Sequence, residues 1–403
     1  MSSAVSGGSG KKALIYYYKL STTLGGGDYL PLLFIAELQQ KGYDIVLALD
    51  WESDLEHAAK LYQVDLDARK VNVLTIKPKN RFIGRMDSVL PFYRTRQLKK
   101  LAKRADVCIS CANMFDFGKP AHHVVYLLKL FGDNAFMDFY LHRKPLSGFP
   151  LLKRRIRTFA AEAFLRPLLG LRSTRRILAD RREHIYVPSR YVADTMRTFY
   201  GPFNCTVFYP PTSFEIPPVK AERDPLRVIY LGRIHPEKRI DSLIGVVERA
   251  RELSGKPLTF HIAGRLENDT YSETMRKLAG EKPWIRLVGA VYGQDKAAFL
   301  LSGTYAIHAE RDEAFGISVT EYLKAGCITI VPDEGGTPEV VDNPALTYHT
   351  NEDAAKILAR LLSDDAFRRE SLNHCRERAK EFSFECYLKN QHRILDNILK
   401  KPS

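Results

Sequence analysis

The sequence predicts an α/β protein with two domains, each built on a parallel β-sheet. Short apolar segments of strand character alternate with segments of helical period along most of the chain. At 403 residues with 45% hydrophobic content, the chain is long enough for two domains of ordinary size. The stiff pair Pro210-Pro211 lies near the middle of the chain and is the predicted hinge between the two domains.

The first half opens with a strand–loop–helix–strand pattern. An aromatic strand over Ala13–Tyr18 is followed by the loop STTLGGG, a helix over Tyr29–Gln40 and a strand over Ile45–Leu49. Gly26 and Gly27 would let the backbone of this loop approach a ligand closely. The loop lacks the third glycine of a dinucleotide fingerprint, and Asp50 is a weak candidate for a ribose-binding carboxylate, so a nicotinamide cofactor is not expected.

The rest of the first half contains further elements of the same kind. We expect strands over 71–76, 107–111 and 184–188, the last being the final strand of the domain, and helices over 95–104 and 189–201. His122 and His123 precede an apolar run and are interpreted as a packed or solvated pair. Between Lys153 and Glu183 there are ten lysines and arginines against three acidic residues, and apolar residues recur at helical period. This segment predicts an amphipathic helix with a cationic face, either packed on the domain or placed against an anionic membrane.

The second half begins with a clean buried strand over Leu226–Leu231, followed by the sequence GRIHPEK and a helix. This order places Gly232, Arg233 and Lys238 at the carboxyl edge of a parallel sheet, where open α/β sheets bind ligands. A strand over 258–263 ends at Gly264, and a strand over 285–291 includes Val288.

The stretch from Tyr305 to Val341 carries the strongest chemical signal. It reads as strand, charged loop, helix, strand and glycine turn, with Gly326 as the helix stop. Its loop, residues 309–314, is too charged to be core. Glu313 precedes the helix, which Phe315, Gly316 and Ile317 open, and Glu321 follows inside it. The free N–H groups at such a helix start favour oxyanions, and the two carboxylates suit hydroxyl groups at two ends of one ligand.

These motifs resemble the retaining GT-B glycosyltransferases of the GT4 group. The pattern Glu-x-Phe-Gly-x4-Glu-x4-Gly is met by Glu313, Phe315, Gly316, Glu321 and Gly326. The strand followed by Gly-Arg, a few residues, Lys and a helix is the second hallmark. The resemblance is specific over 226–341 and loose over the first half.

The resemblance implies two Rossmann-like domains that face each other across a cleft, with the C-terminal helix crossing back to the first domain. The expected boundaries are a flexible tail over 1–12, an acceptor-side domain over 13–206 plus 386–403, and a nucleotide-sugar domain over 207–385.

The resemblance also implies roles for the site residues. Arg233 and Lys238, with backbone N–H groups near Phe315–Ile317, would stabilise the departing diphosphate. Glu321 would accept from the ribose hydroxyls, and Glu313 from a hydroxyl of the donor sugar. The remaining donor-binding positions are expected at Gly26, Gly27, Gly232, Gly264, Val288 and Gly316. No metal and no cofactor are expected, because these cations and N–H groups would carry the diphosphate charge.

The expected reaction is transfer of a hexose from a nucleoside-diphosphate sugar, with retention, to a glycan or lipid-linked acceptor. Mannose from GDP-mannose is preferred, because the motif looks most like the Alg11-type α-mannosyltransferases. UDP-glucose, UDP-N-acetylglucosamine and UDP-galactose remain open as donors, with a soluble or polysaccharide acceptor. Asp28 stands where the mannosyltransferases usually have Glu, which weakens the preference.

Other function classes fit the sequence less well. A net charge of +14 requires an anionic partner but does not choose among nucleic acid, membrane and phosphorylated ligand. A non-catalytic nucleic-acid-binding protein would leave the acidic pair unexplained. No lysine segment suggests the pyridoxal phosphate of a glycan phosphorylase.

The sequence also bears on the protein's surroundings. No apolar run reaches the length of a membrane span, and residues 1–12 are polar and unlike a signal peptide. Cys108 and Cys111 form a lone C-x2-C and are interpreted as buried thiols in a reducing compartment. We therefore expect a cytoplasmic protein, and contact with the cytoplasmic face of a membrane stays open.

Overall fold

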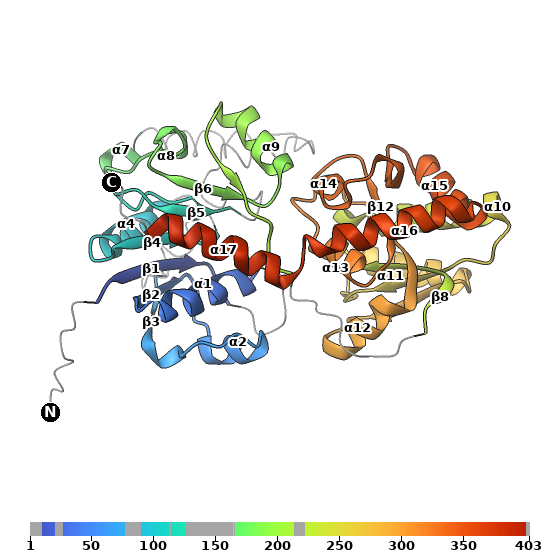
Figure 1. Ribbon diagram of the computed structural model, residues 1–403, viewed down its shortest axis with the longest axis horizontal. Coiled ribbons are helices and arrows are strands. Elements are labelled where there is room, and N and C mark those ends of the chain that lie inside the picture. The colour runs from blue at the N-terminus through green and yellow to red at the C-terminus, as the bar shows by residue number, and fades with distance from the viewer. Residues whose placement is uncertain are drawn as a thin grey trace. The chain divides into compact units, whose positions relative to one another are not determined.

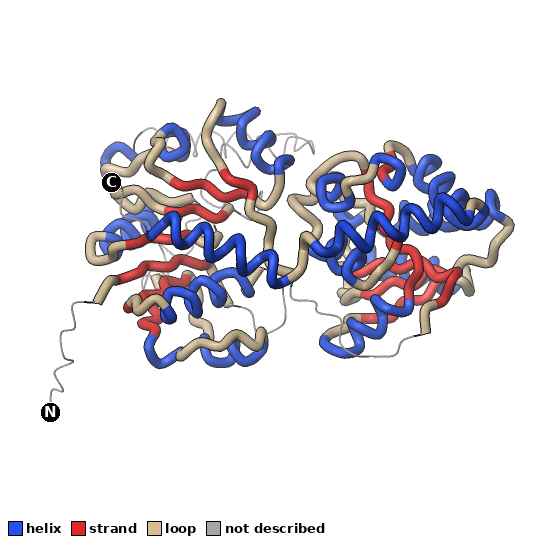
Figure 2. Tube along the Cα trace, viewed as in Figure 1, coloured by secondary structure: helices blue, strands red, loops and turns tan. Residues whose placement is uncertain are grey.

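The computed structural model describes residues 10–20, 27–76, 90–112, 114–125, 164, 166–212 and 222–399. The chain divides into two compact units (Figure 1). The first unit comprises residues 1–188, 192–210 and 389–403, and the second comprises 189–191 and 211–388. In both units the strands form a central layer flanked by helices (Figure 2).

The first unit contains a seven-stranded sheet in the order β3-β2-β1-β4-β5-β6-β7, and every neighbouring pair is parallel. The strands are β1 (Lys12–Tyr17), β2 (Asp44–Leu49), β3 (Val71–Thr75), β4 (Val107–Ser110), β5 (His122–Val124), β6 (His184–Val187) and β7 (Thr206–Val207). The prediction that the strand at 184–188 is the last of this domain is wrong, because β7 pairs beyond it.

Among the described residues, the helices that lie wholly in the first unit are α1 (Tyr29–Gln40), α2 (Leu55–Leu61), the 3-10 helix η1 (Ala68–Lys70), α4 (Leu90–Ala102), α7 (Arg166–Leu168) and α8 (Thr174–Ala179). In the described part of the chain, two helices have residues in both units, namely α9 (Arg190–Tyr200) and α17 (Phe384–Leu399).

The C-terminal part of α17 packs on α1 within the first unit (Figure 1). Glu37 of α1 accepts a hydrogen bond from Gln391 at 2.8 Å and lies 2.6 Å from His392 Nδ1. Lys41 and Asp396 form an ion pair at 2.8 Å. The predicted return of the last helix to the first domain is therefore confirmed.

The second unit contains a six-stranded parallel sheet in the order β10-β9-β8-β11-β12-β13. Its strands are β8 (Asp224–Leu231), β9 (Thr259–Ala263), β10 (Ile285–Gly289), β11 (Gly303–Ile307), β12 (Ile328–Pro332) and β13 (Thr347–Tyr348). Its helices are η3 (Pro236–Lys238), α10 (Ile240–Ser254), α11 (Thr270–Glu281), α12 (Gly293–Ser302), α13 (Ile317–Lys324), α14 (Thr337–Val341), η4 (Pro344–Leu346), α15 (Asn351–Ser363) and α16 (Asp365–Lys380). Each unit is Rossmann-like, as predicted.

The histidine pair of the first unit is packed into the protein. His123 Nε2 lies 3.0 Å from Glu183 Oε2, and both side chains are fully buried. The His122 ring stacks on His184 with centroids 4.5 Å apart, and burial holds its pKa well below the usual value. Cys108 and Cys111 are buried free thiols whose pKa is raised by burial. All four side chains are buried in the first unit.

The basic segment is only partly described. Residues 153–163 and 165 lie outside the described residues, and they carry most of the predicted apolar face. In the described part, α7 ends at Leu168 and α8 begins at Thr174. One continuous amphipathic helix as far as Arg182 is therefore wrong. Among the described residues, no helix has both the length and the apolar character to cross a membrane.

Candidate active site

Four loops at one edge of the second sheet carry most of the predicted site residues. They follow β8, β9, β11 and β12, which are neighbours in the order β9-β8-β11-β12. All four strands are parallel, so their carboxyl ends meet at the same edge. The loops therefore bring together residues that lie far apart in the sequence, from Gly232 to Gly336.

Close backbone contacts explain several glycines of these loops. A Cβ on Gly264 would lie 2.0 Å from the carbonyl oxygen of Gly232. A Cβ on Gly336 would lie 2.3 Å from the carbonyl oxygen of Ala314, and Gly336 N donates to the Glu313 carbonyl at 2.7 Å. These glycines are thus needed for the loops to pack against one another, independently of any contact with a ligand.

Helix α13 starts two residues later than the motif suggested. Gly316 has a φ of +97° and stands just before the helix, which begins at Ile317. The Phe315 side chain is buried, with its ring centroid 5.9 Å from that of Phe382. Phe315 can therefore offer a ligand its backbone but not its ring. The first N–H groups of α13 lie at the sheet edge, as an oxyanion site requires.

Lys238 lies between two carboxylates. It ends the 3-10 helix η3, and its Nζ donates to Glu313 Oε2 at 2.8 Å and also to Glu310. The exposed fractions of the three side chains are only 15% for Lys238, 22% for Glu313 and 18% for Glu310. Burial alone would lower the pKa of Lys238, but the two carboxylates raise it above its usual value. Lys238 therefore keeps its charge.

The two carboxylates differ in protonation. Burial would raise the pKa of Glu313, but Lys238 and then His308 lower it to about 2. Burial and the charge of Glu313 raise the pKa of Glu310 to about 7, against the opposing effect of Lys238. Glu313 is thus the ionised partner of the lysine, and Glu310 exchanges a proton near neutral pH.

His308 completes this cluster from the end of β11. It is buried, its Nε2 lies 3.8 Å from Glu313 Oε2, and neither ring nitrogen has a hydrogen-bond partner among the described residues. Burial lowers its pKa to about 4, although Glu313 acts in the opposite direction. His308 is therefore neutral at pH 7.

His308, Glu310 and Glu313 also offer the elements of a metal site. Their ligand atoms lie within 4.8 Å of one another. The Lys238 ammonium already neutralises the carboxylates, so the cluster is explained without an ion. The absence of a metal from the reaction stays a prediction.

Glu321 has a counter-ion that the sequence did not suggest. It lies on α13 and is 4% exposed. Lys296 of α12 places its Nζ 2.5 Å from Glu321 Oε1. The two acidic residues of the motif thus form ion pairs with different lysines, Glu313 with Lys238 and Glu321 with Lys296.

The other predicted site residues are more scattered. The Arg233 side chain is exposed, and no described residue forms an ion pair with it. Val288 is 41% exposed on β10, and Ile317 is half-buried at the start of α13. Gly27 lies in the first unit, where a Cβ would be 3.0 Å from Tyr17 Oη, and Gly26 lies outside the described residues.

The sequence of the second unit matches a known family. Residues 213–382 fit the family described as glycosyl transferases group 1. The second unit is a group 1 glycosyltransferase domain. The resemblance stated from the motifs is confirmed over this part of the chain.

Three known proteins are similar to this chain in sequence or in structure. The gpi3 subunit of the phosphatidylinositol N-acetylglucosaminyltransferase of Schizosaccharomyces pombe is 28% identical over 154 residues, which are 38% of this chain and 34% of that protein. The Anabaena protein HepE, solved with UDP and glucose, superposes with a TM-score of 0.63 at 14% identity over 96% of this chain and 100% of its own. Sucrose-phosphate synthase from Thermosynechococcus elongatus gives a TM-score of 0.64 at 14% identity, covering 97% and 100%. The two structural matches identify the fold as GT-B. The match to the fission yeast protein spans about a third of that protein's length.

The glycosyltransferase domain contains three functional candidates that the motif did not mark, namely Glu310, His308 and Lys296. Glu310 and His308 carried a signal, since both lie in the loop that begins at the end of β11, a place where α/β sheets bind ligands. Lys296 carried none, because only packing of α12 beside α13 brings it to Glu321.

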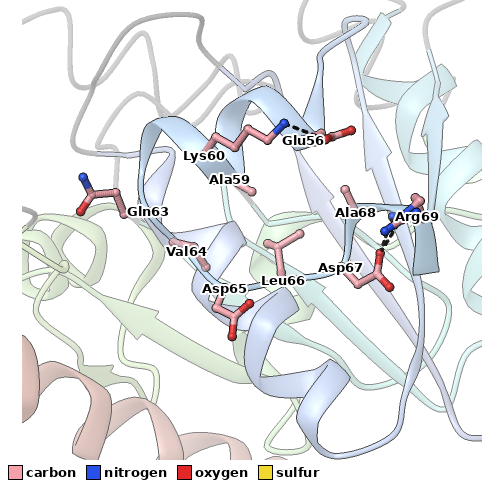
Figure 3. Close-up of a pocket in the computed structure, with 10 residues that line it drawn as sticks. All are labelled: Glu56, Ala59, Lys60, Gln63, Val64, Asp65, Leu66, Asp67, Ala68 and Arg69. Atoms are coloured by element: carbon pink, nitrogen blue, oxygen red, sulfur yellow. Dashed lines mark hydrogen bonds and ion pairs between the residues drawn. The ribbon is translucent and has the colours of Figure 1, made fainter.

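A separate hollow lies on the first unit, outside the glycosyltransferase domain. It encloses about 350 Å³ between α2 and η1, and its rim is charged (Figure 3). Lys60 pairs with Glu56 there at 2.8 Å. The lining residues are Glu56, Ala59, Lys60, Gln63, Val64, Asp65, Leu66, Asp67, Ala68 and Arg69, so none of the predicted site residues lines it.

Proposed function

We propose that this protein is a retaining glycosyltransferase that transfers a hexose from a nucleoside-diphosphate sugar to a glycan or lipid-linked acceptor. The observation that carries the proposal is the cluster of Lys238, Glu310 and Glu313 beside the start of α13, at the ligand-binding edge of a group 1 glycosyltransferase domain. A charged lysine, ionised carboxylate and free helix N–H groups are what a sugar diphosphate requires.

In this proposal the cations act on the leaving group. As the sugar–phosphate bond breaks, negative charge gathers on the diphosphate, and Lys238, Arg233 and the first N–H groups of α13 stabilise it. Lys238 then exchanges a carboxylate oxygen for a phosphate oxygen. Glu313, freed on one side, accepts a hydrogen bond from a hydroxyl of the sugar, and Glu321 accepts from the ribose.

Retention of configuration needs attack from the face that the diphosphate leaves. We favour attack by the acceptor hydroxyl on that face, with the leaving phosphate taking its proton. The new bond forms between the acceptor oxygen and the anomeric carbon, and the bond from that carbon to the diphosphate oxygen breaks. The diphosphate departs with its electron pair and the acceptor proton.

For the sugar, we propose N-acetylglucosamine, delivered as UDP-N-acetylglucosamine, as the donor to test first. Its support is the fission yeast relative, whose name records this sugar. Mannose from GDP-mannose, favoured by the motif around Glu313, is the second donor. The same relative is named for phosphatidylinositol, which supports a lipid acceptor. We propose accordingly that the enzyme acts at the cytoplasmic face of a membrane.

Turnover of the donor tests the function without a known acceptor. Many transferases release free sugar slowly from their donor, and the liberated nucleoside diphosphate can be measured. Lys238→Gln and Arg233→Gln should each lower the rate by about 10²- to 10³-fold, the effect of losing one transition-state contact. Lys380→Gln is the control, since Lys380 is 70% exposed and its ion-pair partner among the described residues is the equally exposed Glu377. Equal rates in all three variants would place the diphosphate elsewhere.

Membrane contact has its own test. Sedimentation with anionic and neutral vesicles at low and high salt should give salt-sensitive binding to the anionic vesicles alone. Failure to bind at low salt would favour a soluble acceptor.

A further inference from the structure

We propose that Lys296 is a positioning residue for Glu321 and thereby sets the preference of the donor site for ribose over deoxyribose nucleotides. The inference rests on the proposed function, because it assigns Glu321 to the ribose. It adds a residue from a neighbouring helix that lies outside the motif.

The ion pair between the two residues is close and largely shielded from water. Lys296 Nζ lies 2.5 Å from Glu321 Oε1. The exposed fractions of the side chains are 24% for Lys296 and 5% for Glu321. A carboxylate this deeply buried needs a counter-charge, because its hydration is lost. In this structure the counter-charge is Lys296.

Packing fixes both ends of the pair. Ala297 and Leu300 of α12 belong to the same buried cluster as Tyr322 of α13. The Tyr322 hydroxyl accepts from Leu231 N at 2.6 Å and donates to Leu231 O at 3.1 Å, which ties α13 to the end of β8. Lys296 and Glu321 are the direct chain neighbours of Ala297 and Tyr322. The core of the unit therefore fixes the backbone positions from which the two side chains meet.

The chemistry of the pair suits a diol. A carboxylate has about four acceptor positions, so a lysine on one oxygen leaves the other able to accept from two neighbouring hydroxyls. The 2′ and 3′ hydroxyls of a ribose are such a pair, and a 2′-deoxyribose offers only one. Without Lys296, Glu321 would be a buried charge with no counter-ion and would turn toward water or another cation. Discrimination between ribose and deoxyribose would then fall.

A different role for Lys296 gives a different result. If its ammonium instead contacts the diphosphate directly, removal of the charge weakens ribose and deoxyribose nucleotides by the same factor. The preference between them would stay unchanged. The ratio of the two affinities therefore separates positioning of Glu321 from direct phosphate binding.

Calorimetry with UDP and 2′-deoxy-UDP tests the inference, or with GDP and 2′-deoxy-GDP if the wild type binds GDP more tightly. The wild type should prefer the ribose form by roughly 10- to 100-fold, the range for one hydrogen bond to a charged group. Lys296→Met removes the ammonium group but keeps an unbranched side chain nearly as long, and it should reduce that ratio to about threefold or less. Lys296→Arg should retain most of the preference. Lys277→Met is the control on α11, since Lys277 is 78% exposed.

The possible results distinguish failure of this inference from failure of the proposed glycosyltransferase function. A wild type that binds neither nucleoside diphosphate overturns both. A wild type that binds without preference, or a Lys296→Met variant that keeps the full preference, overturns the inference alone. If Lys296→Met does not fold, the ratio of the two affinities can be measured in Lys296→Gln and Lys296→Arg instead. A ratio near that of the wild type in Lys296→Gln would again overturn the inference.

Discussion

Replacing Lys238 by methionine should destabilise the second unit, because it leaves two carboxylates together without their cation. Lys238 Nζ lies 2.8 Å from Glu313 and also bonds Glu310. At an effective dielectric constant of about 20, charges about 2.8 Å apart attract by about 6 kcal/mol. Lost hydration offsets part of this attraction, and breaking a buried pair typically costs about 3–5 kcal/mol. Since all three side chains keep some exposure, we expect the lower end, about 3 kcal/mol.

The assay is chemical denaturation at several pH values. In Lys238→Met the folded carboxylates repel each other and bind protons more readily than in the unfolded chain. The folded state therefore binds more protons, and the loss of stability should be largest at pH 8 and shrink toward pH 5. Adding Glu310→Gln should recover part of the loss, because one of the repelling charges is removed.

A matched surface pair is the control. Lys380 lies 2.6 Å from Glu377, but their side chains are 70% and 71% exposed. Lys380→Met should cost no more than about 1 kcal/mol. If Lys238→Met costs no more than Lys380→Met, with no dependence on pH, the cluster is not energetically coupled and its assignment to catalysis loses its physical basis.

Three further predictions follow from individual residues. Glu310, with a pKa of about 7, binds its proton more tightly in the folded state, so the wild type loses stability as the pH rises from 4.5 to 7. Glu310→Gln removes this group, and its melting temperature should therefore fall less over the same pH range. His308→Gln should remove a loss of stability between pH 6.5 and 4, because His308, with a pKa of about 4, stays neutral while the unfolded histidine binds a proton. An unchanged melting profile in either variant contradicts its assignment. Gly264→Ala should cost about 1–3 kcal/mol, since its Cβ would lie 2.0 Å from the Gly232 oxygen, whereas Gly280→Ala, in open space on α11, should stabilise by about 0.5–1 kcal/mol. Denaturation curves that rank them the other way would refute the packing argument.

Much of the fold could be predicted because buried parallel strands are continuous apolar runs. β8 and β9 were clear for this reason, and helix α1 was placed with its observed ends. β7 and β13 have two residues each and are too short to produce a pattern. α2 and α11 were missed although each had a signal, since Asp54 and Asp269 cap them.

The candidate site was predictable as far as it is local. The glycines and carboxylates of the motif lie on one loop–helix segment, and the sequence places them there. In the segment 309–314, Ala309 is buried at 5% exposed, contrary to the prediction, whereas residues 310–314 are half-buried and lie outside the core as predicted. The pairing of Lys238 with Glu313 spans 75 positions, and that of Lys296 with Glu321 spans 25. Such contacts depend on how helices pack, and the sequence pattern of each helix alone does not contain them.

We infer that the second unit binds a nucleoside diphosphate at the edge that holds Lys238 and Glu321. Thermal unfolding with a panel of nucleoside diphosphates and their sugars tests it most directly. A ligand present at about 100 times its dissociation constant adds about 2.7 kcal/mol to the stability of the state that binds it. We expect such stabilisation by UDP or GDP in the wild type and its loss in Glu321→Ala. No stabilisation by any nucleoside diphosphate, or equal stabilisation of wild type and Glu321→Ala, would contradict it.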